Sequence, residues 1–177
     1  MKLVILDRDG VINLDSDQYI KSQEEWKPIA GSLEAIARFT QAGFRVVIAT
    51  NQSGLGRGLF DMATLNAMHD KMHKAVNQLG GRIDAVFFCP HAQDAGCACR
   101  KPRPGMLLEI AERFNVSLAG VPAIGDSLRD LEAASAAGAR PVLVLTGKGE
   151  KTLKSGGLPE GTETHRDLAA AAMALAA

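Results

Sequence analysis

Short apolar runs alternate with stretches of helical periodicity along the chain, and this alternation constrains the fold more than any other feature of the sequence. The stretches between the runs repeat their apolar side chains every three or four residues, as amphipathic helices do. Strands that alternate with helices predict an α/β fold built on a doubly wound, mainly parallel sheet. Five runs rich in Val, Ile, Leu and Phe are the expected strands: Lys2–Leu6, Arg45–Thr50, Ala85–Cys89, Val121–Gly125 and Pro141–Thr146.

The helical stretches have recognisable ends and apolar faces. Ser32 is expected to cap a helix over Leu33–Gln41, which Gly43 would end. The only tryptophan, Trp26, is expected to pack beneath the first crossover. The segment Lys148–Thr164 is rich in Gly and Lys and predicts a mobile surface loop. Further helices are predicted at Met62–Leu79, Gly105–Phe114 and Leu128–Ala137, and in the Ala-rich C-terminal segment.

Length and charge limit the number of domains and the kinds of partner. A chain of 177 residues, 46% of them hydrophobic, can bury one full core, so we expect one domain over residues 1–177. The formal net charge of zero gives no sign of a nucleic-acid or membrane partner. No apolar run approaches the roughly 20 residues of a membrane-spanning helix, and the start, MKLVILDRDG, is unlike a signal peptide. A cytoplasmic monomer is expected.

Two carboxylates follow the first predicted strand. Asp7 and Asp9 are two residues apart, so both side chains project to the same side while the chain stays extended. Two carboxylates at a buried strand end repel each other and lose hydration, and a hard divalent cation such as Mg²⁺ is the simplest remedy. The alternative is that the pair only caps a turn, because this composition is common in turns.

Polar side chains also follow the later strands. Thr50 ends the second strand, Lys101 follows the third, and Asp126 ends the fourth, with Asp130 one helical turn further on. The carboxyl ends of parallel strands meet at one edge of the sheet, where open α/β sheets bind their ligands. We therefore expect these residues to gather around one point with the carboxylates of the first strand.

This set of groups suits phosphoryl transfer through an aspartyl-phosphate. Asp7 would attack phosphorus as the nucleophile, with Mg²⁺ reducing the repulsion between two anions. Asp9 would protonate the leaving oxygen and then deprotonate the water that hydrolyses the intermediate. Thr50 and Lys101 would bind the phosphoryl oxygens that gain charge in the transition state.

Four motifs, DRDG, TNQSG, RKP and GDSxxD, occur in the order found in the haloacid-dehalogenase-like phosphatases, and from Leu3 to Gly147 the chain resembles that family. The resemblance implies that Mg²⁺ is held by the side chain of Asp7, the main-chain carbonyl of Asp9 and the side chain of Asp126. It also implies that Asp130 supports this site without contacting the metal. The connections after the first and third strands are too short for a separate cap domain, so none is expected.

All three cysteines of the chain fall in one short segment, residues 89–103, where they form the pattern C-x-H-x5-C-x-C. Three thiolates and one imidazole make a closed tetrahedral set suited to structural zinc. Free cysteines or a disulfide are the alternatives, although a C-x-C disulfide closes a strained ring. Zinc would add folding energy to a short polar loop and fix the direction of Arg100 and Lys101. The expected ligands are Cys89, His91, Cys97 and Cys99.

The zinc loop is similar to that of two branches of the family, one acting on a heptose bisphosphate and the other on histidinol phosphate. The stretches DRDGVIN, TNQSGLGRG and CRKPRPGM resemble the heptose branch more closely. This implies a hydrolase of carbohydrate metabolism, in the synthesis of lipopolysaccharide or related cell-envelope precursors. Ser127 follows the aspartate of the fourth motif, at a position where a lysine would be an equally plausible substrate contact. The expected substrate-binding residues are Arg8, Asp15, Ser16, Asp17, Gln18, Tyr19, Asn51, Gln52, Ser53 and Arg100.

Rival interpretations exist for the whole chain and for single residues. A receiver-type signalling domain also uses a strand-end Asp with Thr and Lys, but it needs neither Asp9 nor a zinc loop. A phosphosugar mutase would need a cap to exclude water. His69 and His73 have the spacing of a metal pair, yet without a third ligand they are expected to be solvated or partly packed. Arg57 is a candidate for binding a second anionic group, although a solvated surface arginine is the simpler interpretation.

Overall fold

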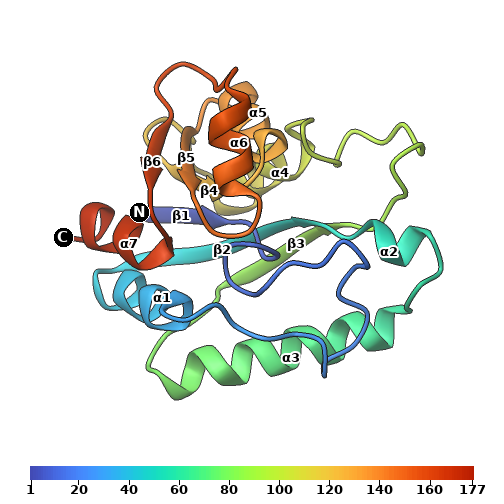
Figure 1. Cartoon of the computed structure of the whole chain (residues 1–177). Helices are drawn as coiled ribbons and strands as arrows, with labels where there is room; N and C mark the ends of the chain where they lie inside the picture. Colours follow the sequence, from blue (N-terminus) through green and yellow to red (C-terminus); the bar gives the residue numbers. More distant parts are fainter.

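A single six-stranded parallel sheet forms the centre of the molecule in the computed structural model, which describes residues 1–177 (Figure 1). The strands lie in the order β3-β2-β1-β4-β5-β6, and every neighbouring pair is parallel. The predicted fold class is therefore confirmed. The strands are β1 (Lys2–Leu6), β2 (Phe44–Asn51), β3 (Ala85–Cys89), β4 (Pro122–Gly125), β5 (Arg140–Val144) and β6 (Glu163–His165).

Helices cover both faces of this sheet, α1, α3 and α7 on one side and α4, α5 and α6 on the other (Figure 1). Successive strand residues point to opposite faces, so Val4 and Leu6 join the larger core cluster while Leu3 and Ile5 join the smaller one. Trp26 is fully buried in the larger cluster, as predicted. The helices are α1 (Ser32–Gln41), α2 (Ser53–Gly56), α3 (Met62–Gln78), α4 (Gly105–Phe114), α5 (Leu128–Ala136), α6 (Gly149–Ser155) and α7 (Leu168–Leu175).

The strand order changes direction at β1. The chain runs from β1 outward through β2 to β3, then crosses back to β4 on the other side of β1. The loops after β1 and β4 therefore leave the sheet side by side and open a crevice between them. Directly beyond β1, the amide of Asp7 donates to the carbonyl of Ile124 in β4 (2.9 Å). The first residue of the crevice is thus held by the sheet itself.

Two local predictions were wrong. Lys148–Thr164 is not a mobile loop, because it contains α6 and the start of β6. Gly31, rather than Ser32, is the N-cap of α1, with a left-handed φ of 87° that glycine adopts without strain. The hydroxyl of Ser32 instead donates to the carbonyl of Val11 (2.7 Å) and ties α1 to the loop after β1.

No helix is both long enough and apolar enough to cross a membrane.

Candidate active site

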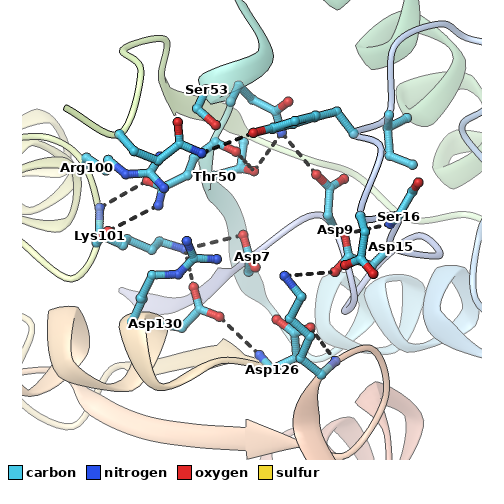
Figure 2. Close-up of a pocket in the computed structure, with 18 residues that line it drawn as sticks. Asp7, Asp9, Asp15, Ser16, Thr50, Ser53, Arg100, Lys101, Asp126 and Asp130 are labelled. Atoms are coloured by element: carbon cyan, nitrogen blue, oxygen red, sulfur yellow. Dashed lines mark hydrogen bonds and ion pairs between the residues drawn. The ribbon is translucent and has the colours of Figure 1, made fainter. Parts of the chain in front are cut away.

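A polar cavity of about 200 Å³ lies where β1, β2 and β4 end, and it brings together the strand-end residues predicted from the sequence (Figure 2). Only two of its 18 lining residues are hydrophobic, so it suits a small charged ligand. Figure 2 shows Asp7 near the centre, with Lys101 and Asp130 on one side and Asp9 on the other. The ends of separate strands therefore supply the centre of the site.

Asp7 and Asp126 are carboxylates that lack enough positive charge around them. Burial raises the pKa of Asp7 well above its usual range, Asp130 adds to the rise, and Lys101 offsets it only in part. Burial, with Asp130 again adding, raises the pKa of Asp126 to about 7. One carboxylate oxygen from each of Asp7, Asp126 and Asp130 lies within 4.8 Å of the others. A hard divalent cation fits this oxygen donor set and would keep the carboxylates ionised at neutral pH.

Asp130 is the member of this cluster whose oxygens already have partners. Its Oδ1 accepts a hydrogen bond from Lys101 Nζ (2.9 Å). Its Oδ2 accepts from the amides of Asp126 (3.1 Å) and Ser127 (3.1 Å) and from the Ser127 hydroxyl (3.0 Å). Burial raises its pKa, but Lys101 and these donors outweigh burial, so the pKa lies below its ordinary value. Asp7 and Asp126 therefore keep the oxygens that are free to meet a metal.

Lys101 is a buried cation clamped from several directions. Its Nζ contacts Asp130, lies 3.4 Å from Asp7 Oδ1 and also donates to the carbonyl of Ala49. Its main chain is paired with Asn51, whose side chain accepts from the Lys101 amide (3.0 Å) and donates to its carbonyl (3.2 Å). The end of β2 thus fixes the segment that carries this lysine.

The carboxylate of Asp9 lies outside the Asp7–Asp126–Asp130 cluster and has its own set of donors. Arg8 Nε (2.8 Å) and Asn13 Nδ2 (2.9 Å) donate to Oδ1, and Gln52 Nε2 (3.4 Å) reaches Oδ2. Burial raises the pKa of Asp9, but the charge of Arg8 and these hydrogen bonds outweigh burial and lower it below the usual range. Gln52 Nε2 also donates to the hydroxyl of Thr50 (3.0 Å). The two predicted reacting aspartates thus have different surroundings and suit different tasks.

The backbone around Asp126 leaves no room for side chains. A Cβ on Gly10, whose φ is +86°, would come within 2.1 Å of Asp126 Oδ2, and one on Gly147 within 2.3 Å of the same atom. The amide of Lys148 donates to this oxygen (2.9 Å). Two glycines and one amide therefore hold the carboxylate against the main chain of the loop after β1.

The predicted zinc ligands do gather in one cluster. Cys89 Sγ lies 2.7 Å from Cys99 Sγ, 3.5 Å from Cys97 Sγ and 3.4 Å from His91 Nδ1, and none of the thiols is in a disulfide. Burial and the neighbouring thiols raise the pKa of Cys99 to about 12, so a cation is needed to hold all three sulfurs as thiolates. Three soft sulfurs and one imidazole fit Zn²⁺. The loop joins β3 to α4 and carries Arg100 directly after the last ligand.

Most, but not all, of the predicted substrate-binding residues line the cavity. Gln18 is exposed outside it, and the side chain of Arg8 is fully buried behind Asp9. Arg8 therefore does not reach a ligand with its side chain, because its guanidinium is enclosed by protein groups. The residues that do line the cavity as predicted are Asp15, Ser16, Asp17, Tyr19, Asn51, Gln52, Ser53 and Arg100.

Four lining residues were not predicted: Ile20, Gln93, Arg129 and Lys148. Lys148 forms an ion pair with Asp15 (3.6 Å), which also lines the cavity. Gln93, in the zinc loop, donates to the Tyr19 hydroxyl (3.1 Å) and accepts from Arg57 Nε (2.8 Å). Arg57 itself does not line the cavity. Of these four residues, only Arg129 could have been expected from the sequence, because it lies within the fourth motif. Lys148 and Gln93 reach the site through contacts between segments that are distant in the chain.

Comparisons with known proteins agree with this geometry. Residues 2–126 match the family model described as polynucleotide kinase 3 phosphatase, and residues 98–171 match one described as HAD-hydrolase-like. A D-glycero-beta-D-manno-heptose-1,7-bisphosphate 7-phosphatase of Bordetella bronchiseptica is 67% identical over 97% of this chain and 96% of its own. This chain belongs to the same family. The heptose-bisphosphate phosphatase of Pseudomonas aeruginosa is 57% identical over 98% of this chain and 97% of its own.

Solved structures of heptose-bisphosphate phosphatases superpose on the chain. The Bordetella bronchiseptica enzyme, described as complexed with magnesium and phosphate, has a TM-score of 0.98 at 66% identity and covers 99% of this chain and 98% of its own. The enzyme of Burkholderia thailandensis has a TM-score of 0.80 at 59% identity and covers 98% and 97%. The predicted membership of the haloacid-dehalogenase-like phosphatases, and of their heptose branch, is confirmed, and the histidinol-phosphate alternative is not supported. The chain is a phosphatase, not a receiver-type signalling domain.

Proposed function

We propose that this protein is a Mg²⁺-dependent phosphatase that removes the 7-phosphate of D-glycero-β-D-manno-heptose 1,7-bisphosphate, in the synthesis of lipopolysaccharide or related cell-envelope precursors. The observation that carries the proposal is the 67% identity, over nearly the full length of both chains, to an enzyme of that name. The carboxylates, lysine and hydroxyl around the cavity are the chemical groups such a reaction needs. We propose the β anomer as substrate because the names of the relatives specify the β anomer.

The residues divide the reaction between them in two steps. In the first, an Asp7 oxygen attacks phosphorus, the bond from phosphorus to the C7 oxygen breaks, and Asp9 gives that oxygen a proton. In the second, Asp9 takes a proton from water, the water oxygen attacks phosphorus, and Asp7 leaves as a carboxylate. Thr50 and Lys101 bind phosphoryl oxygens throughout, in a site where Lys101 is already held by Asp130.

Asp7 and Asp126 would hold Mg²⁺ with their side chains, and Asp9 would do so with its main-chain carbonyl, as the family resemblance implies. When bound, the ion offsets the charge repulsion between a carboxylate nucleophile and a phosphate dianion. Asp130 keeps Asp126 and Lys101 in place through its four hydrogen bonds. The protein thus prepares the site before either ion or substrate arrives.

The second phosphate of a bisphosphate needs its own positive charge. Arg100, Arg129 and Lys148 line the cavity in addition to Lys101, so its wall carries more cations than one phosphoryl group requires. Arg100 Nη1 is buried without a hydrogen-bond partner, which is costly unless a ligand supplies one. We assign these rim cations to the 1-phosphate and the sugar. The zinc ligands would hold Arg100 and Lys101 at the cavity wall.

A cytoplasmic location fits the three free thiols of the proposed zinc loop, which a reducing compartment would maintain. That the protein is a monomer with one domain over residues 1–177 stays a prediction. Size-exclusion chromatography with light scattering would test the monomer directly.

The decisive experiment measures Mg²⁺-dependent phosphate release and compares kcat/KM for the β and α anomers of the heptose bisphosphate and for histidinol phosphate. We expect the β-anomer to be preferred over histidinol phosphate by several orders of magnitude. A preference for histidinol phosphate would overturn the proposal, while a preference for the α-anomer would overturn only the choice of anomer. Asp7→Asn, measured in parallel, should abolish turnover and leave zinc content and the circular-dichroism spectrum unchanged.

A further inference from the structure

We propose that His69, on α3 and outside the cavity, is a positioning residue for the acid/base step: it anchors the buried guanidinium of Arg8, which in turn sets the orientation of the Asp9 carboxylate. The proposal rests on the acid/base role proposed above for Asp9. It assigns a function to a histidine that has no place in the motifs of the family resemblance.

The first observation is a fully buried charge. Arg8 is 0% exposed, although an arginine is almost never buried completely unless its charge and its N–H groups are paired. Its Nε bonds Asp9 Oδ1 (2.8 Å), its Nη2 donates to Gln52 Oε1 (3.3 Å), and its Nη1 lies 3.2 Å from His69 Nε2. Because guanidinium has only donors and keeps its charge, the ring nitrogen that faces it must be an acceptor. His69 therefore contributes a neutral imidazole with its proton on Nδ1.

The surroundings of His69 also favour a neutral imidazole. His69 is buried, and burial together with the charge of Arg8 lowers its pKa to about 3. The remaining neighbour of Arg8 Nη1 is Met68 Sδ at 3.9 Å, a weak acceptor. Without the imidazole, this end of the guanidinium would have no good partner. A buried unpaired cation would turn toward another acceptor and carry Asp9 with it.

The second observation is that the network closes on the reacting groups. Gln52 accepts from Arg8 and donates both to Asp9 Oδ2 (3.4 Å) and to the Thr50 hydroxyl (3.0 Å). Both oxygens of Asp9 are therefore held, while its side chain remains 23% exposed toward the cavity. His69 does not line the cavity, so its influence on a substrate passes through Arg8. Helix α3 thereby contributes to the chemistry without contacting the ligand.

A positioning role differs from a merely structural one in its dependence on the leaving group. An acid is needed most when the leaving alkoxide is basic, and least when the leaving group is a stable phenolate. Misplacing Asp9 should therefore slow the cleavage of phenyl phosphate strongly and that of p-nitrophenyl phosphate weakly. A loss of folded protein would lower both rates by one common factor.

The test measures kcat/KM for a series of aryl phosphates of rising leaving-group pKa with the Mg²⁺-loaded, zinc-replete enzyme. This ratio reports only the steps up to departure of the phenol, so the later hydrolysis of the aspartyl-phosphate, in which Asp9 acts as a base, does not enter the comparison. His69→Leu removes the acceptor, and His69→Gln retains one in the form of an amide oxygen. His73→Leu is the matched control, because His73 lies one turn further along α3 and has no hydrogen bond to the network. His69→Asn is a second variant without reach to Arg8, for use if the leucine variant fails to fold.

We expect His69→Leu or His69→Asn to lower kcat/KM by about 10- to 100-fold for the poorest leaving group and by less than about 3-fold for p-nitrophenyl phosphate. His69→Gln should restore most of kcat/KM, and His73→Leu should match the wild type. An equal loss across the series, or no loss, would overturn the proposal. This readout does not need the heptose substrate, so it remains valid even if the substrate proposed above is wrong; wild-type turnover of the bisphosphate tests that point separately.

Discussion

Replacing Asp130 by asparagine tests the charge arrangement of the site with almost no change of shape. Asp130 Oδ1 accepts from Lys101 Nζ, and Oδ2 accepts from the amides of Asp126 and Ser127. An asparagine cannot serve both sides, because its NH₂ group must face either the ammonium of Lys101 or the two backbone amides. One side of the network therefore loses its acceptor in every rotamer.

The cost follows from burial. Asp130 and Lys101 are 7% and 5% exposed, and removing one partner of such a buried pair costs about 3–5 kcal/mol. Lys101 keeps Asp7 at 3.4 Å and the carbonyl of Ala49, so we expect the lower end, about 3 kcal/mol. With a urea slope of about 2 kcal/mol per molar, the midpoint of unfolding should fall by about 1.5 M. Because Lys101 moves, kcat should also fall about 100-fold.

The assay is urea unfolding followed by circular dichroism, paired with steady-state kinetics at saturating Mg²⁺. Asp61→Asn is the matched control, because Asp61 caps α3 in solvent by accepting from the Thr64 amide (2.9 Å) and asparagine caps equally well. That control should change stability by less than about 0.5 kcal/mol. If Asp130→Asn destabilised the protein by less than about 1 kcal/mol and left kcat intact, the reasoning from the buried pair would be refuted.

Three further predictions concern the zinc loop, pH and the close packing at the metal site. Removing zinc with a chelator should expose residues 89–103 to proteolysis and lower activity, and added zinc should restore both; full activity in zinc-free protein, checked by metal analysis, would contradict this. Burial and Arg8 lower the pKa of His69 to about 3. Below about pH 6.5 the unfolded chain therefore binds a proton that the folded chain does not, and the protein loses stability as the pH falls. Between pH 6.5 and 5 the wild type should lose about 1.6 kcal/mol more than His69→Gln in urea titrations, and parallel curves would refute the assignment. Gly10→Ala should raise the Mg²⁺ concentration for half-maximal activity at least about 10-fold, because its Cβ would displace Asp126, whereas Gly58→Ala, with φ +74° and nothing within 4 Å, should not.

The sequence allowed prediction of the parallel sheet and of the groups at its strand ends. Buried parallel strands read as continuous apolar runs, and residues at the end of such a run or directly after it must lie at the carboxyl edge, as Asp7, Thr50 and Asp126 do. The cysteine and histidine cluster could be predicted from the sequence equally well, because its members are close in the chain and their chemistry is distinctive. Local spacing was sufficient in both cases.

Other features depend on contacts that no local pattern records. The strand β6 has only three residues, too few to show an alternation, and α6 contains no apolar stripe, so the sequence of Lys148–Thr164 predicts a loop instead. The ion pair of Lys148 with Asp15 and the pairing of Arg8 with His69 join segments that are far apart in the chain. Arg8 illustrates the limit: it is among the substrate-binding residues expected from the sequence, and only the packed structure shows that its side chain is fully buried in the protein.

The central position of β1 has a consequence for the order in which the molecule opens. Native proteins lose hydrogen-exchange protection first at edges and termini, and last in strands paired on both sides. β1 is paired with β2 and β4, and the amide of Asp7 is bonded to Ile124, whereas β6 is an edge strand three residues long. Breathing motions should therefore begin at β6 and α7 and leave the centre of the sheet closed. The amide of Asp7 would then be among the slowest to exchange, and the nucleophile would remain in register while the periphery of the molecule fluctuates.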